Sequence, residues 1–332
     1  MAALSTSFAT LADLATRLDP NGKVAPVVEL QSKMLPLYRE MLWKEGNQST
    51  GERTTVRTGL PAPSWRLINK GVVPTTGSTA QIEFKTAVLE SRSSVDQLLV
   101  DISNDKNEFR LSEAVSHIEG MAQEFESTLF YGSNASPEEF VGLAQFYSDP
   151  TAGNGQNVID AGGTDVSDNT SIWFINWGPD VFGLYPQGLP AGMQREDKGL
   201  QTVHNFNGTT NEQLDMYVEK FQMAAGVAIR DWRRVVRIGS IDVSALVAQS
   251  SDADLIFYMT KAYHRLRRSM GVGSTAIYVN PTVAEFLDHQ RQQKLTAGGG
   301  VTMQNIDGED VLSFRGIPIR ISDSILNTEA PV

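Results

Sequence analysis

Cysteine is absent from this chain of 332 residues. The absence excludes disulfide bonds, a thiolate nucleophile and a cysteine-ligated metal, so the fold must be held together by non-covalent packing. Long apolar runs are also missing, since none approaches the roughly 20 residues that a membrane span needs. The N-terminal stretch has neither the basic start nor the unbroken apolar run of a signal peptide. We therefore expect no membrane partner and a protein that stays in the cytoplasm where it is made.

Positive charge is scarce. The sequence has 28 Lys and Arg against 39 Asp and Glu, which gives a formal net charge of -11. A dedicated nucleic-acid binder needs a basic surface, so this balance argues against that class and leaves room only for local basic patches. With 41% hydrophobic and 20% charged residues the composition is that of a globular protein, long enough for one large domain or two.

Motifs that carry enzyme chemistry are missing too. No histidine belongs to an HExxH or i,i+4 pair, and neither a GxSxG elbow nor a GxxxxGK[ST] loop occurs. The pattern Gly271-x-Gly273-x-x-Ala276 precedes an expected strand, whereas a dinucleotide-binding loop follows one. Asp160, Asp165 and Asp168 lack the ligand spacing of an EF-hand and are better read as a solvated loop. We predict no catalytic residue, no cofactor and no metal site.

The first half of the chain contains two expected helices. A stripe at three- and four-residue spacing predicts a helix over residues 27–44, with Pro36 as a kink. A longer helix is predicted over residues 108–131, with Asn107 as its N-cap and Gly132 as its stop. Its expected buried stripe consists of Leu111, Val115, Ile118, Ala122, Phe125 and Leu129. At ~1.5 Å per residue this helix would be about 36 Å long, which suits a strut across a sheet.

Between these helices, residues 51–100 have a different character. Three prolines, several glycines and short alternating runs predict extended chain with few core formers. Two strands closed by the proline-rich tip would project as an arm, and the alternative is a hairpin folded onto the body. Trp65, Leu67 and Ile68 are large apolar groups in a segment otherwise too polar to bury itself. They need a partner surface, so we predict that they form an assembly interface.

The second half alternates strands and helices. Residues 171–177 predict a strong strand, and residues 227–241 predict a strand that carries four arginines. Among them, Arg233 and Arg234 are candidates for an assembly interface, because ion pairs within the chain or between subunits are favoured over contact with a polyanion. A helix over 251–270, a strand over 276–279, a helix capped by Asn280 and strands over 301–304, 311–315 and 317–321 predict a compact α+β or α/β subdomain.

Several segments together resemble the major capsid proteins of tailed bacteriophages, which share the Hong-Kong-phage-type capsid fold. The first is the long helix running into LFYGSNASPEEFVGLAQFY. The others, in the family's order, are TSIWFINWGPDVFGLYPQG, YVEKFQMAAGVAIRDWRRVVRIGSID, YVNPTVAEFLDHQ and FRGIPIRISDSIL. Each segment is a loose match alone, but their succession is fairly specific and covers about two thirds of the chain.

The resemblance implies an α+β capsid fold: an N-terminal arm (1–50), an extended loop (51–100), a peripheral domain with a spine helix and a sheet (101–245) and a compact axial domain with a returning C-terminal strand (246–332). It implies a structural protein of the virion, not an enzyme, that self-assembles into hexamers and pentamers of an icosahedral shell. The implied partners are other copies, a portal, a scaffold, in some cases a cement protein, and packaged double-stranded DNA bound without sequence specificity. Some relatives form Lys to Asn isopeptide bonds, but no matching Asn or catalytic Glu is identified here for Lys70 or Lys85. A cytoplasmic enzyme with a dispersed site and a tail or baseplate protein are the alternatives.

Overall fold

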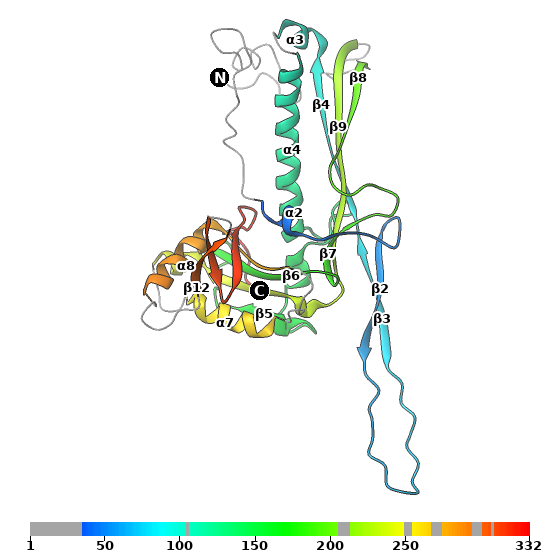
Figure 1. The fold of residues 1–332 in the computed structure, drawn as a ribbon, viewed down its shortest axis with the longest axis vertical. Helices are drawn as coiled ribbons and strands as arrows, with labels where there is room; N and C mark the ends of the chain where they lie inside the picture. Colours follow the sequence, from blue (N-terminus) through cyan, green and yellow to red (C-terminus); the bar gives the residue numbers. More distant parts are fainter. Residues whose placement is uncertain are drawn as a thin grey trace.

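The computed structural model describes residues 35–103, 106–204, 213–248, 254–266, 274–293, 301–306 and 309–332. Within these residues the fold is mixed α+β, with three sheets of five, seven and two strands. Figure 1 shows a long helix beside a tall sheet, a second sheet with its helices at the foot of that helix, and a projecting hairpin. No helix of the described part is both long and apolar enough to cross a membrane.

The tall sheet has the order β1-β7-β9-β4, with β8 also paired to β9. Its strands are β1 (Trp43–Glu45), β4 (Ala87–Asp96), β7 (Val181–Tyr185), β8 (Gln194–His204) and β9 (Gln213–Ile229). The 17-residue strand β9 pairs antiparallel with β4 over the whole length of β4 and with β7 at the C-terminal end of β9. Because β9 spans both partners, it ties the tall sheet to the core of the molecule.

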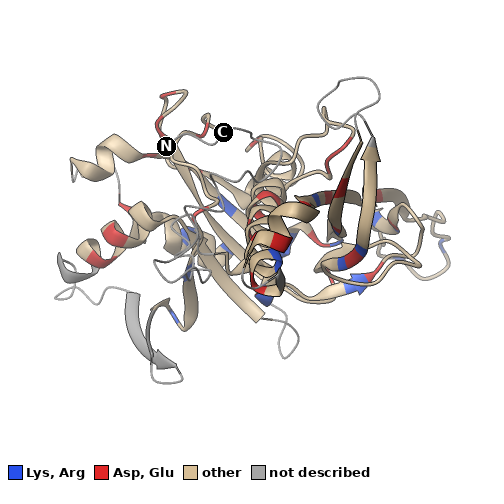
Figure 2. Ribbon diagram, turned by 90° about the horizontal axis from the view of Figure 1, so that it is seen from above, with Lys and Arg blue, Asp and Glu red and all other residues tan. Residues whose placement is uncertain are grey.

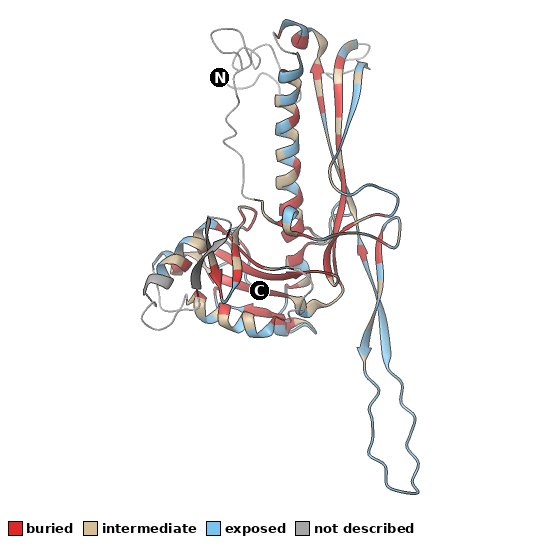
Figure 3. Cartoon of the chain, in the orientation of Figure 1, coloured by how far each residue is buried: buried red, intermediate tan, exposed pale blue. Residues whose placement is uncertain are grey.

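The long helix α4 (Lys106–Tyr131) lies along this sheet and follows the short helix α3 (Gln97–Ile102). Asp96 caps α3 by accepting a hydrogen bond from the backbone N–H of Leu98 at 2.8 Å. Residues 108–131 are helical as predicted, but most of the residues predicted to form the buried stripe are not buried. Leu111 is 55% exposed and Ile118 is 40% exposed, and the exposed residues of α4 follow its outer side in Figure 3.

The buried side of α4 is rotated by roughly 50° about the helix axis from the predicted stripe. Its buried residues are Phe109, Ala114, Met121, Phe125 and Leu129, so only the last two predicted positions are confirmed. His117, which lies between Ala114 and Met121 in the sequence, stacks its ring on that of Phe221 in β9, with the ring centroids 5.8 Å apart. This side of α4 faces the sheet because the inner face of the sheet carries Phe221 and charged residues. Polar residues of α4 pair with these charged residues.

The seven-stranded sheet has the order β12-β13-β14-β11-β6-β10-β5. Its strands are β5 (Val158–Asp160), β6 (Asn169–Trp177), β10 (Val235–Asp242), β11 (Ser274–Val279), β12 (Val301–Ile306), β13 (Glu309–Phe314) and β14 (Ile317–Ile321). Every residue of β6 is buried. Side chains alternate across a strand, so Trp173 and Ile175 enter one core cluster while Ile172 and Phe174 enter another.

Helices and short turns complete this half of the molecule. They are α5 (Leu143–Phe146), η1 (Gly155–Asn157), η2 (Trp232–Arg234), α6 (Val243–Val247), α7 (Leu255–Arg265) and α8 (Pro281–Gln293). The predicted strand over 227–241 is wrong in its middle, because the Asp231 carboxylate accepts from the N–H of Arg233 and turns the chain between β9 and β10. The helix predicted over 251–270 is shorter, with Asp254 as its N-cap, and its outer parts lie outside the described residues.

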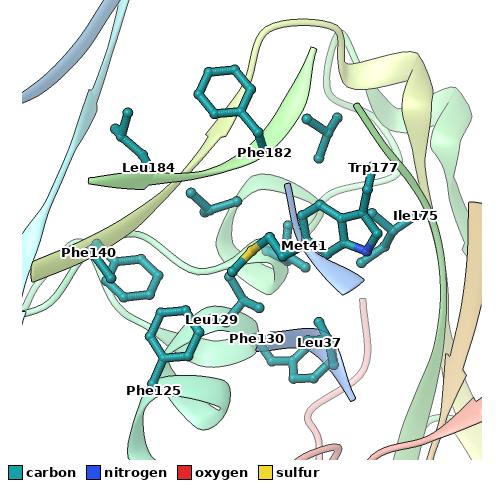
Figure 4. Packing of buried hydrophobic residues seen from close by; sticks show 14 of the residues in the cluster. Leu37, Met41, Phe125, Leu129, Phe130, Phe140, Ile175, Trp177, Phe182 and Leu184 are labelled. Atoms are coloured by element: carbon teal, nitrogen blue, oxygen red, sulfur yellow. The ribbon is translucent and has the colours of Figure 1, made fainter. Parts of the chain in front are cut away.

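The N-terminal segment enters the core through its first described residues. Only α2 (Leu37–Glu40) is helical, with Pro36 at its N-cap, so the prediction of a helix continuing to residue 44 is wrong; residues 27–34 lie outside the described part. The chain becomes extended at Met41 because β1 gains parallel pairing with β7. Leu37 and Met41 pack beside Phe125 of α4 in the main core (Figure 4).

The third sheet is the projecting hairpin, formed by β2 (Gly51–Gly59) and β3 (Ser78–Lys85). Residues 60–77 form its tip and contain no strand. The following strand β4 pairs with β9, so residues 87–96 belong to the tall sheet and the hairpin ends before the expected boundary at residue 100. The expected division at residue 245 does not follow the sheets either, because β5, β6 and β10 join the C-terminal strands.

Candidate assembly surfaces

The hairpin tip is the most exposed apolar surface of the described chain. Trp65 is 105% exposed, and Leu67 and Ile68 are exposed beside it. A tight turn presents them, in which the N–H of Lys70 donates to the carbonyl of Leu67 at 3.1 Å and Asn69 has a φ of 68°. Apolar groups left in water cost free energy, so this tip has the character of an interaction surface.

The base of the hairpin is held by a buried ion pair. The Glu52 carboxylate is 2% exposed and pairs with the guanidinium of Arg230, which also lies over the ring of Phe182 at 5.0 Å. A buried carboxylate needs such a partner because burial without one is costly. Asn47 adds two hydrogen bonds to the backbone of Arg53, at 2.7 and 2.8 Å. These contacts fix the direction in which the hairpin leaves the body.

Each arginine of the 230–237 run has a carboxylate partner within the chain. Beyond the Arg230 pair, Arg233 binds Asp231 at 2.8 Å and Arg234 binds Asp180 at 2.6 Å. Burial works against ionisation of Asp231, but the hydrogen bonds and charge of Arg233 and the charge of Arg234 outweigh it and lower the pKa of that carboxyl. These side chains are therefore occupied within one subunit.

Arg237 belongs to a buried cluster that fastens the C-terminal segment. Its guanidinium donates to Glu329 at 2.8 Å and to the carbonyl of Tyr147 at 3.0 Å. The hydroxyls of Tyr131 and Ser171 also donate to Glu329, which joins the end of α4 to β6 and β10. Burial, and next the charge of Glu329, raise the pKa of Tyr131 well above its ordinary value, so its hydroxyl stays protonated and donates.

A second buried carboxyl, Glu126, lies where the N-terminal segment meets α4. Burial raises its pKa to about 7, although the hydroxyl of Ser322 donates a hydrogen bond at 2.6 Å that acts in the opposite direction and lowers the pKa. Nearby, Glu40 of α2 accepts from the hydroxyl of Tyr278 at 2.6 Å and from Arg320 at 2.5 Å. The N-terminal segment is thus tied to β11 and β14 by polar contacts, and Leu37 is buried in the same core cluster as Tyr278.

The two groups of predicted interface residues do not come together. Trp65, Leu67 and Ile68 lie at the hairpin tip, whereas Arg233 and Arg234 lie in η2 against β6. Sequence reasoning missed Glu52 and Glu329, since nothing in a sequence tells a buried carboxylate from a surface one before its partner is known. Within the described residues, no group of three or more His, Asp and Glu side chains is placed to hold a metal ion.

Comparison with known proteins identifies what this fold is. The family model described as major capsid protein GP7 matches residues 19–332. The chain belongs to this family. A chain in the cryo-EM structure of bacteriophage Epsilon15 is 30% identical, with a TM-score of 0.76 over 100% of this chain and 99% of that one. No curated protein matches the chain.

Family membership makes this a major capsid protein of a tailed-phage head. It is a structural, non-enzymatic component of the virion shell, and it assembles with copies of itself. The predicted family and function are thereby confirmed. Among other capsid structures, that of bacteriophage JBD30 is 11% identical, covers 97% of this chain and 96% of that one, and has a TM-score of 0.45.

Proposed function

We propose that this capsid protein builds the hexamers and pentamers of an icosahedral shell around packaged double-stranded DNA, and that its hairpin is the arm that joins neighbouring subunits. The observation that carries the proposal is the exposure of the hairpin tip, where no other part of the described chain covers the side chain of Trp65. Burying Leu67, Ile68 and Trp65 on a neighbour would stabilise the contact by about 1.5–3 kcal/mol for each side chain. Self-association supplies that neighbour.

The sheets support a division of labour within the subunit. We assign the peripheral domain to the tall sheet with α4, and the axial domain to the seven-stranded sheet with α7 and α8. The segment before β1 serves as the N-terminal arm in this proposal. A portal, a scaffold and a cement protein complete the set of expected partners, and DNA lies against the inner face without base-specific contacts.

A deletion tests the role of the hairpin. Residues 60–76 are replaced by a short Gly-Ser bridge, and unfolding temperature, sedimentation and negative-stain images are measured on the same sample. We expect a folded, soluble subunit that forms no shells, because the tip packs on no part of its own chain. Normal particles would overturn the proposal, and a clear loss of monomer stability would indicate a hairpin folded onto its own body.

Point variants give this test a matched control. Trp65→Ser removes an exposed apolar group from the tip, whereas Val166→Ser removes an exposed apolar group from a loop elsewhere in the molecule. We expect Trp65→Ser to raise the protein concentration needed for assembly at least tenfold and Val166→Ser to leave it unchanged. Equal effects of the two variants would show that general surface apolarity, and not the tip, drives association.

A further inference from the structure

A pocket with apolar walls lies at the base of the hairpin, between α4, β4, β9 and the loop that follows α4. It has about 380 Å³ of empty space, counting the solvent at its open side, and is lined by Phe125, Phe140, Leu89 and Met223 among others. An opening of this kind suits one large side chain from a partner.

The loop that forms one wall is held in place by close backbone contacts. The N–H of Gly142 donates to the carbonyl of Gly132 at 2.8 Å, which closes the loop on itself. A Cβ on Gly132 would meet the carbonyl oxygen of Phe140 at 2.2 Å, so the approach requires glycine. The wall that carries Glu138 and Glu139 is therefore a built feature of the fold.

The rim of this pocket is acidic. Glu124 of α4 and Glu138 and Glu139 of the loop line it, and all three are exposed. Glu139 accepts one hydrogen bond, from the N–H of Ser133 at 3.2 Å. No Lys or Arg of the described chain forms an ion pair with any of the three. The rim thus presents unpaired negative charge around an apolar centre.

The hairpin tip has the complementary chemistry. Residues 60–77 contain Arg66 and Lys70 and no acidic residue, although the whole chain carries a net charge of -11. Neither cation forms an ion pair with a described residue, and the fully exposed Trp65 precedes Arg66 in the sequence. Complementary charge around an apolar anchor is the pattern that gives protein interfaces their specificity and register.

The occupant must come from another copy. From Gly51 to the tip the chain spans about 14 residues, or ~45 Å at 3.3 Å per residue, and Figure 1 shows the hairpin pointing away from the body. The pocket lies at the opposite end, beside Ala87, where the hairpin is rooted. A tip that binds the base of a neighbour makes a head-to-tail contact, and contacts of this type form rings when the rotation between neighbours closes.

We propose that this acidic pocket receives the hairpin tip of a second copy of the chain, with Trp65 in the apolar centre and Arg66 and Lys70 against the glutamates of the rim. The proposal rests on the proposed function and names the surface that the arm recognises. Its failure is distinguishable from failure of that function, because the deletion of residues 60–76 tests the arm without reference to the pocket.

Charge reversal tests the pairing. The tip variant Arg66→Glu with Lys70→Glu and the pocket variant Glu138→Lys with Glu139→Lys should each raise the concentration needed for assembly at least tenfold. Combining all four changes in one chain should restore assembly. Adding Glu285→Lys to the tip variant is the control; it reverses an exposed acid on α8 and should restore nothing. A fourfold variant that stays folded and defective would overturn the pairing.

Mixing the two defective variants gives a sharper result. In an alternating ring, each reversed tip meets a reversed pocket and each unchanged tip meets an unchanged pocket. Even-membered rings should therefore form in a 1:1 mixture, while five-membered rings cannot alternate and should be missing from negative-stain images. Assembly of either variant alone, or pentamers as abundant as hexamers in the mixture, would contradict the proposal.

The absence of cysteine allows a direct measurement of proximity. Ile68→Cys and Glu138→Cys are placed in one chain and treated with a short bismaleimide, and Ile68→Cys with Glu285→Cys serves as the matched control. We expect ladders of cross-linked subunits with the first pair and none with the control. Cross-linked monomers would show that the tip folds onto its own pocket, and no cross-link in assembled shells would show that the tip binds another surface.

Discussion

At the scale of single residues, the buried ionisable groups of this subunit lie where its segments meet. Glu52 joins the hairpin to β9, Glu329 joins the C-terminal segment to α4, and Glu126 lies beside the N-terminal segment. Each is at most 6% exposed. A buried carboxyl depends on its partners, so these three positions make the junctions sensitive to substitution and to pH.

Glu126 predicts a pH dependence of stability. Burial raises its pKa from 4.5 to about 7, so the folded state holds this proton more tightly than the unfolded state. The resulting stability is fully present below pH 4.5 and is lost as pH rises through 7, a difference of about 3 kcal/mol. Unfolding at pH values from 4.5 to 8 should show that Glu126→Gln removes this part of the profile. Glu124→Gln, an exposed neighbour on the same helix, should leave it intact.

The Arg237 and Glu329 pair predicts a large loss of stability when it is broken. Glu329→Ala leaves a guanidinium buried without its carboxylate, which should lower the free energy of unfolding by about 3–5 kcal/mol. Arg233→Ala is the control: this side chain is nearly half exposed, and its loss should cost less than about 1 kcal/mol. Denaturant unfolding measures both, and similar small effects would mean that the C-terminal segment is not fastened by this pair.

At the scale of elements, the sequence predicts the existence of α4 better than the side it buries. Its extent follows from local signals, because helical periodicity and Gly132 mark its course and its end. Its orientation depends on the sheet, where Arg110 pairs with Glu219 at 2.7 Å and Ser91 contacts His117 at 2.7 Å. Such pairings link residues more than 25 positions apart, so periodicity alone places Leu111 and its neighbours on the wrong side.

This orientation predicts opposite outcomes for two aspartate substitutions. Ile118→Asp, which the sequence alone marks as disruptive, should cost less than about 1 kcal/mol because the side chain is 40% exposed. Phe125→Asp places a carboxylate in the main core, where Phe125 is 2% exposed, and should cost at least several kcal/mol. Thermal unfolding compares them directly. A larger effect at Ile118 would show that the outer side of α4 is covered by another part of the shell protein.

At the scale of the whole molecule, the order of segments predicted the family correctly, and the extended character of residues 51–59 and 78–85 is visible in their alternation. The sheet topology could not be predicted, because β6 lies between β10, about 60 residues later, and β11, about 100 residues later. The pocket at the base of the hairpin could not be predicted either. Its walls come from two strands, a helix and a loop, and only the fold brings Glu124 close to Glu138.

The distribution of charge over the subunit predicts weak binding to DNA. Basic and acidic residues are interspersed in the part of the chain that Figure 2 colours, and the arginines of the 230–237 run are all paired with carboxylates. A protein that neutralises Z phosphates loses affinity with salt at a slope of about -0.9Z, so a subunit whose clustered arginines already bind carboxylates should show a shallow slope. A capsid shell that binds DNA weakly would also not impede the packaging and release of the DNA.

The measurement is fluorescence anisotropy of a labelled duplex with the isolated subunit between 50 and 200 mM salt. We expect weak binding whose affinity depends much less steeply on salt concentration than that of a protein with six to ten phosphate contacts. The double variant Arg233→Ala with Arg234→Ala should change it little, since Asp231 and Asp180 already occupy these side chains. Tight binding at physiological salt that this variant abolishes would show that DNA displaces the carboxylates, and that η2 belongs to the DNA-facing surface of the shell.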